Sequence, residues 1–320
     1  MTLRKILMKR GLVDETLADE GEAISEEELA TSSPRYSSET LINTMSAYLL
    51  KEDGLMESYG PYKDADIRAS GAHTYCARLH MLSKLYGDGT EMGLTDIPIH
   101  LAWTFEIGSA VHDRLQNQIL AKTNIILGCW ENPLTDEVIG DVADPNSWVT
   151  YPGPGWLFLE PAAYNEEYDI GGHTDGGVDL ANGRRGILEI KTISKTEYDK
   201  LKKPKPEHVI QASIYMWLFG LKDSLFLYTC KGWCKTPNRK SRKIAGGQGH
   251  ELGPFKTFHI PYDGSVVLDL MKQISAAKKS FAALEEGRKE YPDRLPACHI
   301  KSASRSKQCP MSSLCFEIKD

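Results

Sequence analysis

The stretch GHTDGGVDLANGRRGILEIKTI, residues 172–193, contains two apolar segments separated by the dipeptide Asn182-Gly183. Asn-Gly between two apolar segments is a strong local signal for a β-hairpin, because both residues tolerate the positive φ angles of a tight turn. We therefore predict one strand over 172–180 and a second over 186–193. This hairpin is the starting point for the rest of the fold.

Polar residues interrupt the second strand of this hairpin at every other position. Side chains alternate between the faces of a strand, so Glu189 and Lys191 share one face while Leu188 and Ile190 point into the core. The hairpin can bring Asp175, on the first strand, alongside them. The pattern predicts two carboxylates and one ammonium group at one place.

Asp175, Glu189 and the backbone carbonyl of Ile190 together form a hard-oxygen site suited to Mg2+ or Mn2+. Such an ion can polarise a phosphodiester, and Lys191 can orient the attacking water or stabilise the growing charge on phosphorus. A Glu-x-Lys pair on a strand is also common as a surface ion pair, and that alternative remains open for these residues taken alone.

Two helical segments flank the hairpin and carry further polar residues. His112 follows Gly108 by one turn, so the two share a helix face, where the glycine permits a close backbone approach. Gln211 and Tyr215 are also one turn apart and point the same way. The alternative for His112 is a hydrogen-bonded core histidine, and for the Gln-Tyr pair a half-buried helix face.

Four motifs thus occur in order along the chain: Gly108-x-x-Val111-His112, Gly172-x-x-Asp175, Glu189-Ile190-Lys191 and Gln211-x-x-x-Tyr215. In identity, order and approximate spacing they resemble the RecB-like branch of the PD-(D/E)XK superfamily of nucleases. The resemblance extends from about residue 70 to the C-terminus. One departure is Thr174, which precedes the acidic residue of the second motif where the superfamily name has proline.

The resemblance implies an α/β fold with a restriction-endonuclease-like core, a central mixed sheet flanked by helices. It also implies a helical N-terminal part and a C-terminus held by an iron-sulfur cluster. In this family the histidine is an additional metal ligand and the Gln-x-x-x-Tyr pair lies beside the active site, near DNA. These roles would fall to His112, Gln211 and Tyr215.

Three cysteines lie near the C-terminus, at Cys298, Cys309 and Cys315. By analogy with the iron-sulfur members of the family, Cys76 supplies a fourth ligand. Four thiolates suit a 4Fe-4S cluster or a zinc ion, and the wide separation of the first ligand from the others favours iron-sulfur. The alternative is four unrelated buried thiols. Cys129 is assigned as an ordinary buried thiol. Cys230 and Cys234 form a Cys-x3-Cys pair that we interpret as reduced thiols on a basic loop, with metal binding as the alternative.

Residues 1–36 are acidic and Ser-rich and predict a mobile extension, whereas 37–320 predict one nuclease domain that includes the cluster-binding segment 298–315. Apolar spacing predicts helices over 40–50, 73–86, 103–120, 207–219 and 266–286. Strands are expected at 156–159, 224–229 and 256–261, in addition to the hairpin. The segment 231–253 is rich in Gly, Lys and Arg and predicts an exposed loop.

The net charge of −6 argues weakly against nucleic acid as a partner, but the charge is unevenly distributed. Basic residues gather in the 231–253 segment, and we predict that four of them contact DNA: Arg239, Lys240, Arg242 and Lys243. A solvated surface is the alternative. The N-terminus lacks the apolar stretch of a signal peptide and no segment reaches the length of a membrane span, which indicates a cytoplasmic protein. The small size, the lack of a motor motif and the cysteine pattern of the tail indicate a prokaryotic cell or a phage-infected host.

The sequence therefore predicts a Mg2+- or Mn2+-dependent deoxyribonuclease, an exonuclease acting on single strands or DNA ends. No nucleotide-binding Gly-x-x-x-x-Gly-Lys motif occurs, so a helicase, a recombinase or a CRISPR protein would be a separate partner. Two alternatives remain. One is a nucleic-acid-binding recombination-accessory protein with a structural metal site, and the other is a ribonuclease.

Overall fold

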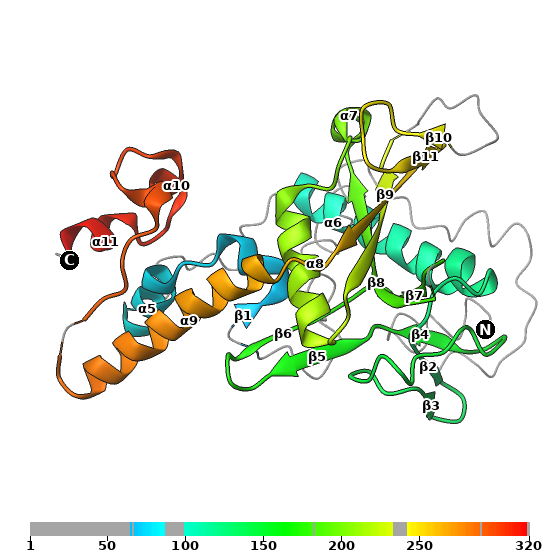
Figure 1. Cartoon of the computed structure of the whole chain (residues 1–320), viewed down its shortest axis with the longest axis horizontal. Coiled ribbons are helices and arrows are strands. Elements are labelled where there is room, and N and C mark those ends of the chain that lie inside the picture. Colours follow the sequence, from blue (N-terminus) through cyan, green and yellow to red (C-terminus); the bar gives the residue numbers. More distant parts are fainter. Residues whose placement is uncertain are drawn as a thin grey trace, which may run out of the picture.

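The computed structural model describes residues 65, 67–86, 99–181, 183–232, 242–288 and 290–318 (Figure 1). The predicted extension over 1–36 and the predicted helix over 40–50 lie outside the described residues. The same holds for Arg239, Lys240 and Cys234 in the basic segment. The proposed division into extension and domain stays a prediction.

A six-stranded mixed sheet forms the centre of the fold, as expected (Figure 1). β8 (Arg185–Ile193) pairs in parallel with β9 (Asp223–Cys230), and the chain crosses between them through α7 (Lys195–Lys200) and α8 (Pro206–Leu218). The other pairings are antiparallel. Across the sheet the strands run in the order β10 (Arg242–Lys243), β11 (His250–Leu252), β12 (Phe255–Pro261), β9, β8, β7 (Gly176–Asp179).

The alternation of β8 side chains places different helices on the two faces of this sheet. Ile187 packs with residues of α8 and of the long helix α9 (Gly264–Glu285). Leu188 and Ile190 pack instead with residues of η4 (Leu115–Leu120), the continuation of α6 (Ile99–Arg114). The predicted helices over 103–120, 207–219 and 266–286 are confirmed, and the end of the first is a π-helix.

The hairpin predicted from residues 172–193 is correct in its second strand and wrong in its first. β6 (Ile170–His173) and β7 belong to different sheets, so the predicted strand over 172–180 is interrupted at Thr174 and Asp175. The buried Thr174 hydroxyl donates to the carbonyls of Gly176 and Leu188, and Gly176 has a φ of +149°. A local side-chain hydrogen bond and a glycine conformation thus replace the ladder at this point.

Two three-stranded sheets lie beside the central one. The first has the order β1 (Ile67–Arg68), β6, β5 (Ala162–Asn165), and the second has the order β3 (Glu137–Ile139), β2 (Cys129–Asn132), β4 (Leu157–Leu159). β4 confirms the strand predicted near residues 156–159. Among the described residues, no helix combines the length and apolar character needed to span a membrane.

The helix predicted over 73–86 is wrong in its first turn. A 3-10 helix, η2 (Ala69–Thr74), is followed by Tyr75 and Cys76, and α5 (Ala77–Tyr86) begins only after them. The Leu79 N–H donates to the Cys76 sulfur at 3.5 Å and the His80 N–H donates to the Cys76 carbonyl at 2.9 Å. Cys76 therefore caps α5 and does not lie inside it.

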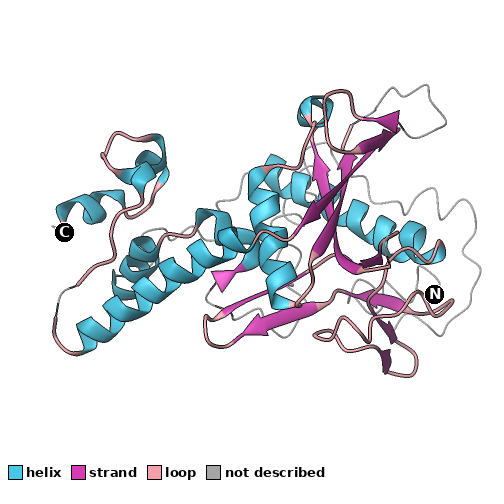
Figure 2. Cartoon of the chain, viewed as in Figure 1, coloured by secondary structure: helices cyan, strands magenta, loops and turns pink. Residues whose placement is uncertain are grey.

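The C-terminal segment forms three short helices: η5 (Pro296–Cys298), α10 (Ser304–Gln308) and α11 (Ser312–Glu317). α11 packs against α5, and α10 packs against η5 and α11. Figure 2 shows the last two helices near the C-terminus. Arg78 of α5 donates to the backbone carbonyls of Pro292, Cys315 and Ile318. These bonds attach the chain end to a helix residue that lies 240 positions before the last carbonyl it contacts, that of Ile318.

The basic segment is only partly the loop that its composition predicts. β10 and β11 extend the edge of the central sheet within it, because Arg242 and Lys243 pair with Glu251 and His250. β10 lies four strands from β8, about 19 Å at the usual spacing of neighbouring strands. These two basic residues are therefore on the edge of the sheet away from Glu189.

Candidate functional site

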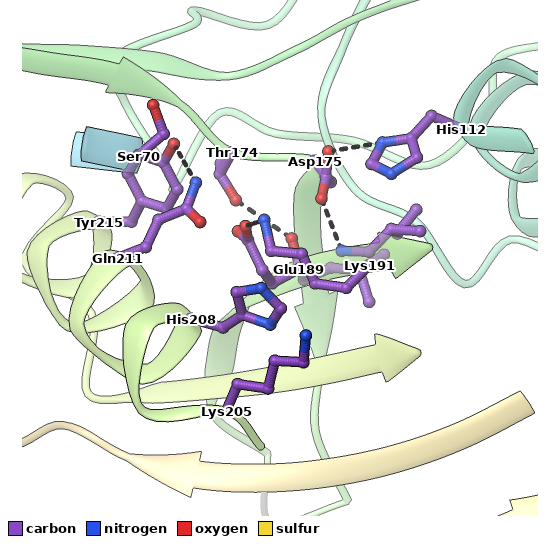
Figure 3. Close-up of polar contacts among 12 residues, drawn as sticks. Ser70, His112, Thr174, Asp175, Glu189, Lys191, Lys205, His208, Gln211 and Tyr215 are labelled. Atoms are coloured by element: carbon purple, nitrogen blue, oxygen red, sulfur yellow. Dashed lines mark hydrogen bonds and ion pairs between the residues drawn. The ribbon is translucent and has the colours of Figure 1, made fainter. Parts of the chain in front are cut away.

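The residues of the four motifs come together between α6, α8 and the break that separates β6 from β7 (Figure 3). Figure 3 shows His112 reaching in from α6 and Tyr215 from α8, with Asp175 and Glu189 between them. We use the name catalytic cluster for five side chains: His112, Glu160, Asp175, Glu189 and Lys191.

Asp175 occupies the strand break and uses both carboxylate oxygens. Its Oδ1 lies 3.1 Å from His112 Nδ1, and its Oδ2 accepts a hydrogen bond of 2.6 Å from the Ile190 N–H. Burial alone would raise the pKa of Asp175, but the positive groups of His112 and Lys191 outweigh it and hold that pKa below its ordinary value. Burial would likewise lower the pKa of His112, and Asp175 reverses this and raises it.

Glu189 is almost fully buried, with 1% of its surface exposed, and pairs with Lys191 of the same strand at 2.5 Å between Oε1 and Nζ. Its second oxygen, Oε2, is buried and has no hydrogen-bond partner among the described residues. Burial, followed by repulsion from Asp175, raises the pKa of Glu189 to about 7. Burial would lower the pKa of Lys191, but the Glu189 and Asp175 carboxylates outweigh it and raise that pKa.

Glu160 joins the cluster although the sequence did not single it out. Gln116 of η4 donates from Nε2 both to Glu160 Oε1 and to the Asp175 carbonyl, each at 3.1 Å. Glu160 is exposed at the surface, but protein groups surround its carboxylate, and loss of hydration and the nearby Asp175 raise its pKa to about 7. An acid directly after an apolar strand, β4, was the available signal.

Gln211 and Tyr215 point the same way, as their spacing predicts, and lie beside the cluster, as the family resemblance implies. The Gln211 amide donates to the Tyr215 hydroxyl at 3.0 Å, and the Tyr215 ring is 3% exposed. A Cβ at Gly172 would lie 2.8 Å from this ring, so the glycine of the second motif makes room for Tyr215. Burial, followed by the charge of Glu189, raises the pKa of Tyr215 well above its ordinary value. Tyr215 is thus a neutral hydroxyl at neutral pH.

Gly108 brings α6 against β8, as predicted. A Cβ at Gly108 would lie 3.4 Å from Thr192 Oγ1 of β8, an ordinary contact distance, so the glycine is less strictly required here than Gly172 is. His112, one turn further on, then reaches Asp175. Its side chain is 26% exposed and lies 3.1 Å from a carboxylate, and its role as a metal ligand stays a prediction.

The donors of the cluster fit a divalent cation chemically, since they comprise carboxylate oxygens and one imidazole. The buried Glu189 Oε2, without a partner among the described residues, is the observation that speaks most directly for a missing cation. As the side chains stand, no group of three or more His, Cys, Asp or Glu in the described part of the chain is arranged to hold a metal ion. Ligation by the Ile190 carbonyl stays a prediction.

The four cysteines predicted to act together line one cavity between α5 and the C-terminal helices. We call it the cysteine cavity; its wall contains Cys76, Cys298, Cys309, Cys315, Ser306, Arg78, Arg294 and apolar side chains. Burial raises the pKa of Cys76 and of Cys309, and the neighbouring thiols Cys298 and Cys315 contribute. These thiols therefore need a positive partner before they ionise at neutral pH.

Among the described residues, Cys129, Cys230 and His299, the neighbour of Cys298 and a weak candidate for a substitute ligand, do not line the cysteine cavity. Cys129 is fully buried in β2, and burial raises its pKa to about 12, which confirms its assignment as an inert thiol. Cys230 ends β9. His299 is exposed, with Nδ1 3.0 Å from the Pro296 carbonyl.

Two of the four basic residues predicted to contact DNA lie in the described part of the chain. Arg242 forms an ion pair with Glu251 at 2.8 Å, and the neighbouring Lys243 is exposed. DNA contact by this pair stays a prediction.

No protein-family model and no curated protein matches this chain. Three solved structures have a distantly similar arrangement. An alkaline exonuclease from Laribacter hongkongensis is 17% identical, with 69% of this chain and 90% of that one covered and a TM-score of 0.35. A phage related exonuclease from Haemophilus somnus 129PT is 13% identical, with 69% and 95% covered and a TM-score of 0.37. The protein SSO0001 is 14% identical, with 88% and 98% covered and a TM-score of 0.39. Because these TM-scores are below 0.5, no residue role is taken from them.

Proposed function

We propose that this protein is a metal-dependent deoxyribonuclease that hydrolyses DNA phosphodiester bonds, as an exonuclease on single strands or DNA ends. The observation that carries the proposal is the buried Glu189 Oε2, which lacks a partner among the described residues and sits beside Asp175 and Lys191. A buried carboxylate oxygen of this kind is unfavourable unless a cation or a proton accompanies it. A cation would satisfy it.

His112, Asp175, Glu189 and the Ile190 carbonyl would hold Mg2+ or Mn2+, with Glu160 as an added ligand. When bound, such an ion polarises the phosphodiester and lowers the pKa of an attacking water. Before it binds, His112 must give up its proton, since its raised pKa favours the charged form and a ligand nitrogen must be neutral. Glu189 and Glu160, with pKa values near 7, must lose theirs as well.

Lys191 is the residue that we assign to the reacting phosphate. Its raised pKa keeps it an ammonium group at neutral pH, and it is held at the cluster by Glu189. Glu189 would hold the cation, and Lys191 would face phosphate oxygens and stabilise the charge that develops on them. Gln116 positions Glu160 and the Asp175 backbone through two hydrogen bonds.

For the cysteine cavity we propose a 4Fe-4S cluster held by Cys76, Cys298, Cys309 and Cys315, with zinc as the alternative occupant. Support comes from the four side chains that share one cavity wall although they belong to opposite ends of the described chain. Cys76 also caps α5, where helix N–H groups favour a thiolate. A bound group would join the C-terminal segment to α5, a structural role.

The proposed substrate is DNA, with RNA as the alternative, and the proposed sites of attack are single strands or DNA ends. The proposed protein partner is a helicase, a recombinase or a CRISPR protein. A nucleic-acid-binding accessory protein remains the competing class. It is disfavoured by the presence together of Asp175, Glu189 and Lys191, because binding alone does not need a buried carboxylate pair.

Digestion of 5′-labelled and 3′-labelled single and double strands by the purified chain tests the proposal. Cleavage is expected with Mg2+ or Mn2+, none with EDTA, and none by the matched Asp175→Asn protein. An RNA strand of the same sequence separates the two nuclease classes. If wild-type protein binds these strands but never cuts them in either metal, the accessory class is correct.

A further inference from the structure

One serine in the wall of the cysteine cavity has a buried hydroxyl without a partner in the part of the chain that the structure describes. Ser306, on α10, is 1% exposed, and its Oγ is buried with no hydrogen-bond partner among the described residues. Its position is fixed locally, because the Ser306 carbonyl accepts a hydrogen bond of 3.2 Å from the Cys309 N–H. A buried hydroxyl normally has a partner, so this one indicates an acceptor that the described residues do not supply.

Two arginines, Arg78 and Arg294, place positive charge in the wall of the cysteine cavity. Arg294 donates to the carbonyls of Cys315 and Ile318, both at 2.9 Å, and Arg78 donates to the same two carbonyls. Their guanidinium groups also lie over aromatic rings, Arg78 over Tyr291 and Arg294 over Phe316. Arg78 is 1% exposed, so its charge is poorly screened by water.

We propose that Ser306 donates a hydrogen bond to a sulfur of the group held by the four cysteines, and that Arg78 and Arg294 offset the negative charge of that group. The inference rests on the cofactor proposed above. A hydrogen bond to sulfur and nearby positive charge both favour the more negative, reduced form of an iron-sulfur cluster. Both raise its reduction potential, and both favour retention of the thiolates.

The experiment uses the full chain, purified anaerobically, with the cluster reduced one electron at a time at an electrode. Ser306→Ala is compared with Ser304→Ala, an exposed serine of the same helix. We expect Ser306→Ala to retain iron and sulfide but to show a three- to tenfold lower ratio of reduced to oxidised cluster at a fixed potential. A tenfold change corresponds to about 59 mV for one electron. Ser306→Thr keeps the hydroxyl and should restore the ratio.

Arg294→Gln should also lower the ratio of reduced to oxidised cluster at a fixed potential. Arg294→Lys, which keeps the charge, should lower that ratio less. Equal midpoints for wild type, Ser306→Ala and Ser304→Ala overturn the proposal. If the isolated protein holds zinc, the readout is the chelator concentration that removes half of it. A value several-fold lower for Ser306→Ala alone supports the hydrogen bond, and an unchanged value overturns it.

A wild-type chain that binds neither iron nor zinc overturns this inference together with the cofactor. The nuclease proposal is separated from both outcomes, because it is measured with added Mg2+ or Mn2+ at the catalytic cluster.

Discussion

The catalytic cluster and the cysteine cavity are built in different ways. In the cluster, oppositely charged side chains pair directly: Asp175 with His112, and Glu189 with Lys191. The pairing of β7 with β8 fixes the backbone next to Asp175 relative to Glu189. In the cavity, four thiols face an otherwise mostly apolar wall, and two arginines hold the chain end through backbone carbonyls. We therefore expect the side chains of the cluster to keep their positions without a ligand. We expect the stability of the cysteine cavity to depend more on the group that it binds.

The largest effect is expected at Lys191. Lys191→Met removes the ammonium group that faces the reacting phosphate, and we expect about a thousandfold loss of cleavage, equivalent to about 4 kcal/mol. The fold should persist, because Glu189, the partner of Lys191, has a pKa near 7 and can take up a proton when the ammonium group is removed. Single-turnover digestion and circular dichroism measure the two quantities. Cleavage within tenfold of wild type would remove Lys191 from the reaction.

The contrasting variant is Cys315→Ser, which should act on stability and metal content more than on the cleavage step. We expect loss of bound iron or zinc and a lower unfolding temperature, because the C-terminal helices lose one of their attachments to α5. Cys230→Ser is the matched control and should keep the metal. If Cys315→Ser retains the full metal content, the four-cysteine site is wrong.

A smaller effect is expected at Gln116, which touches the cluster only through its hydrogen bonds to Glu160 and Asp175. Gln116→Met keeps the volume and removes both bonds. We expect ten- to hundredfold weaker activation by Mn2+, the usual cost of losing an outer contact to a metal ligand. Gln118→Met, in the same helical segment, is the control. Activation curves that coincide for both variants and wild type would contradict a positioning role.

The pH dependence of stability gives an effect that builds up gradually, over the range between the ordinary pKa of Glu189 and its raised one. The pKa of Glu189 is raised to about 7 in the folded protein from an ordinary 4.5, so the folded state holds its proton more tightly than the unfolded state. This stabilisation is complete below about pH 4.5 and is lost as the pH rises through 7, by up to about 1.4 kcal/mol per pH unit. Urea unfolding in EDTA measures it. Glu189→Gln, which does not titrate, should show a flatter profile, and identical profiles would rule out the raised pKa.

The sequence predicted those helices and strands whose apolar residues follow a single regular spacing, either that of a strand or that of a helix. The second hairpin strand, α8 and α9 follow from alternation and helical spacing, and the motif residues on them meet as expected. The break at Thr174 was missed because it depends on a tertiary hydrogen bond to Leu188. Glu160 was missed for a related reason, since its role is set by Gln116 from a distant π-helical segment.

Cleavage by Glu189→Gln tests the central claim most directly, because this change keeps the shape of the buried side chain and removes its charge. Wild type and variant are purified in parallel, and nucleotide release from labelled single-stranded DNA is followed in Mg2+ and in Mn2+. We predict a loss of about a thousandfold in both metals with unchanged DNA binding. Equal rates for the two proteins, with contaminating nuclease excluded, would contradict the assignment of this site as the nuclease centre.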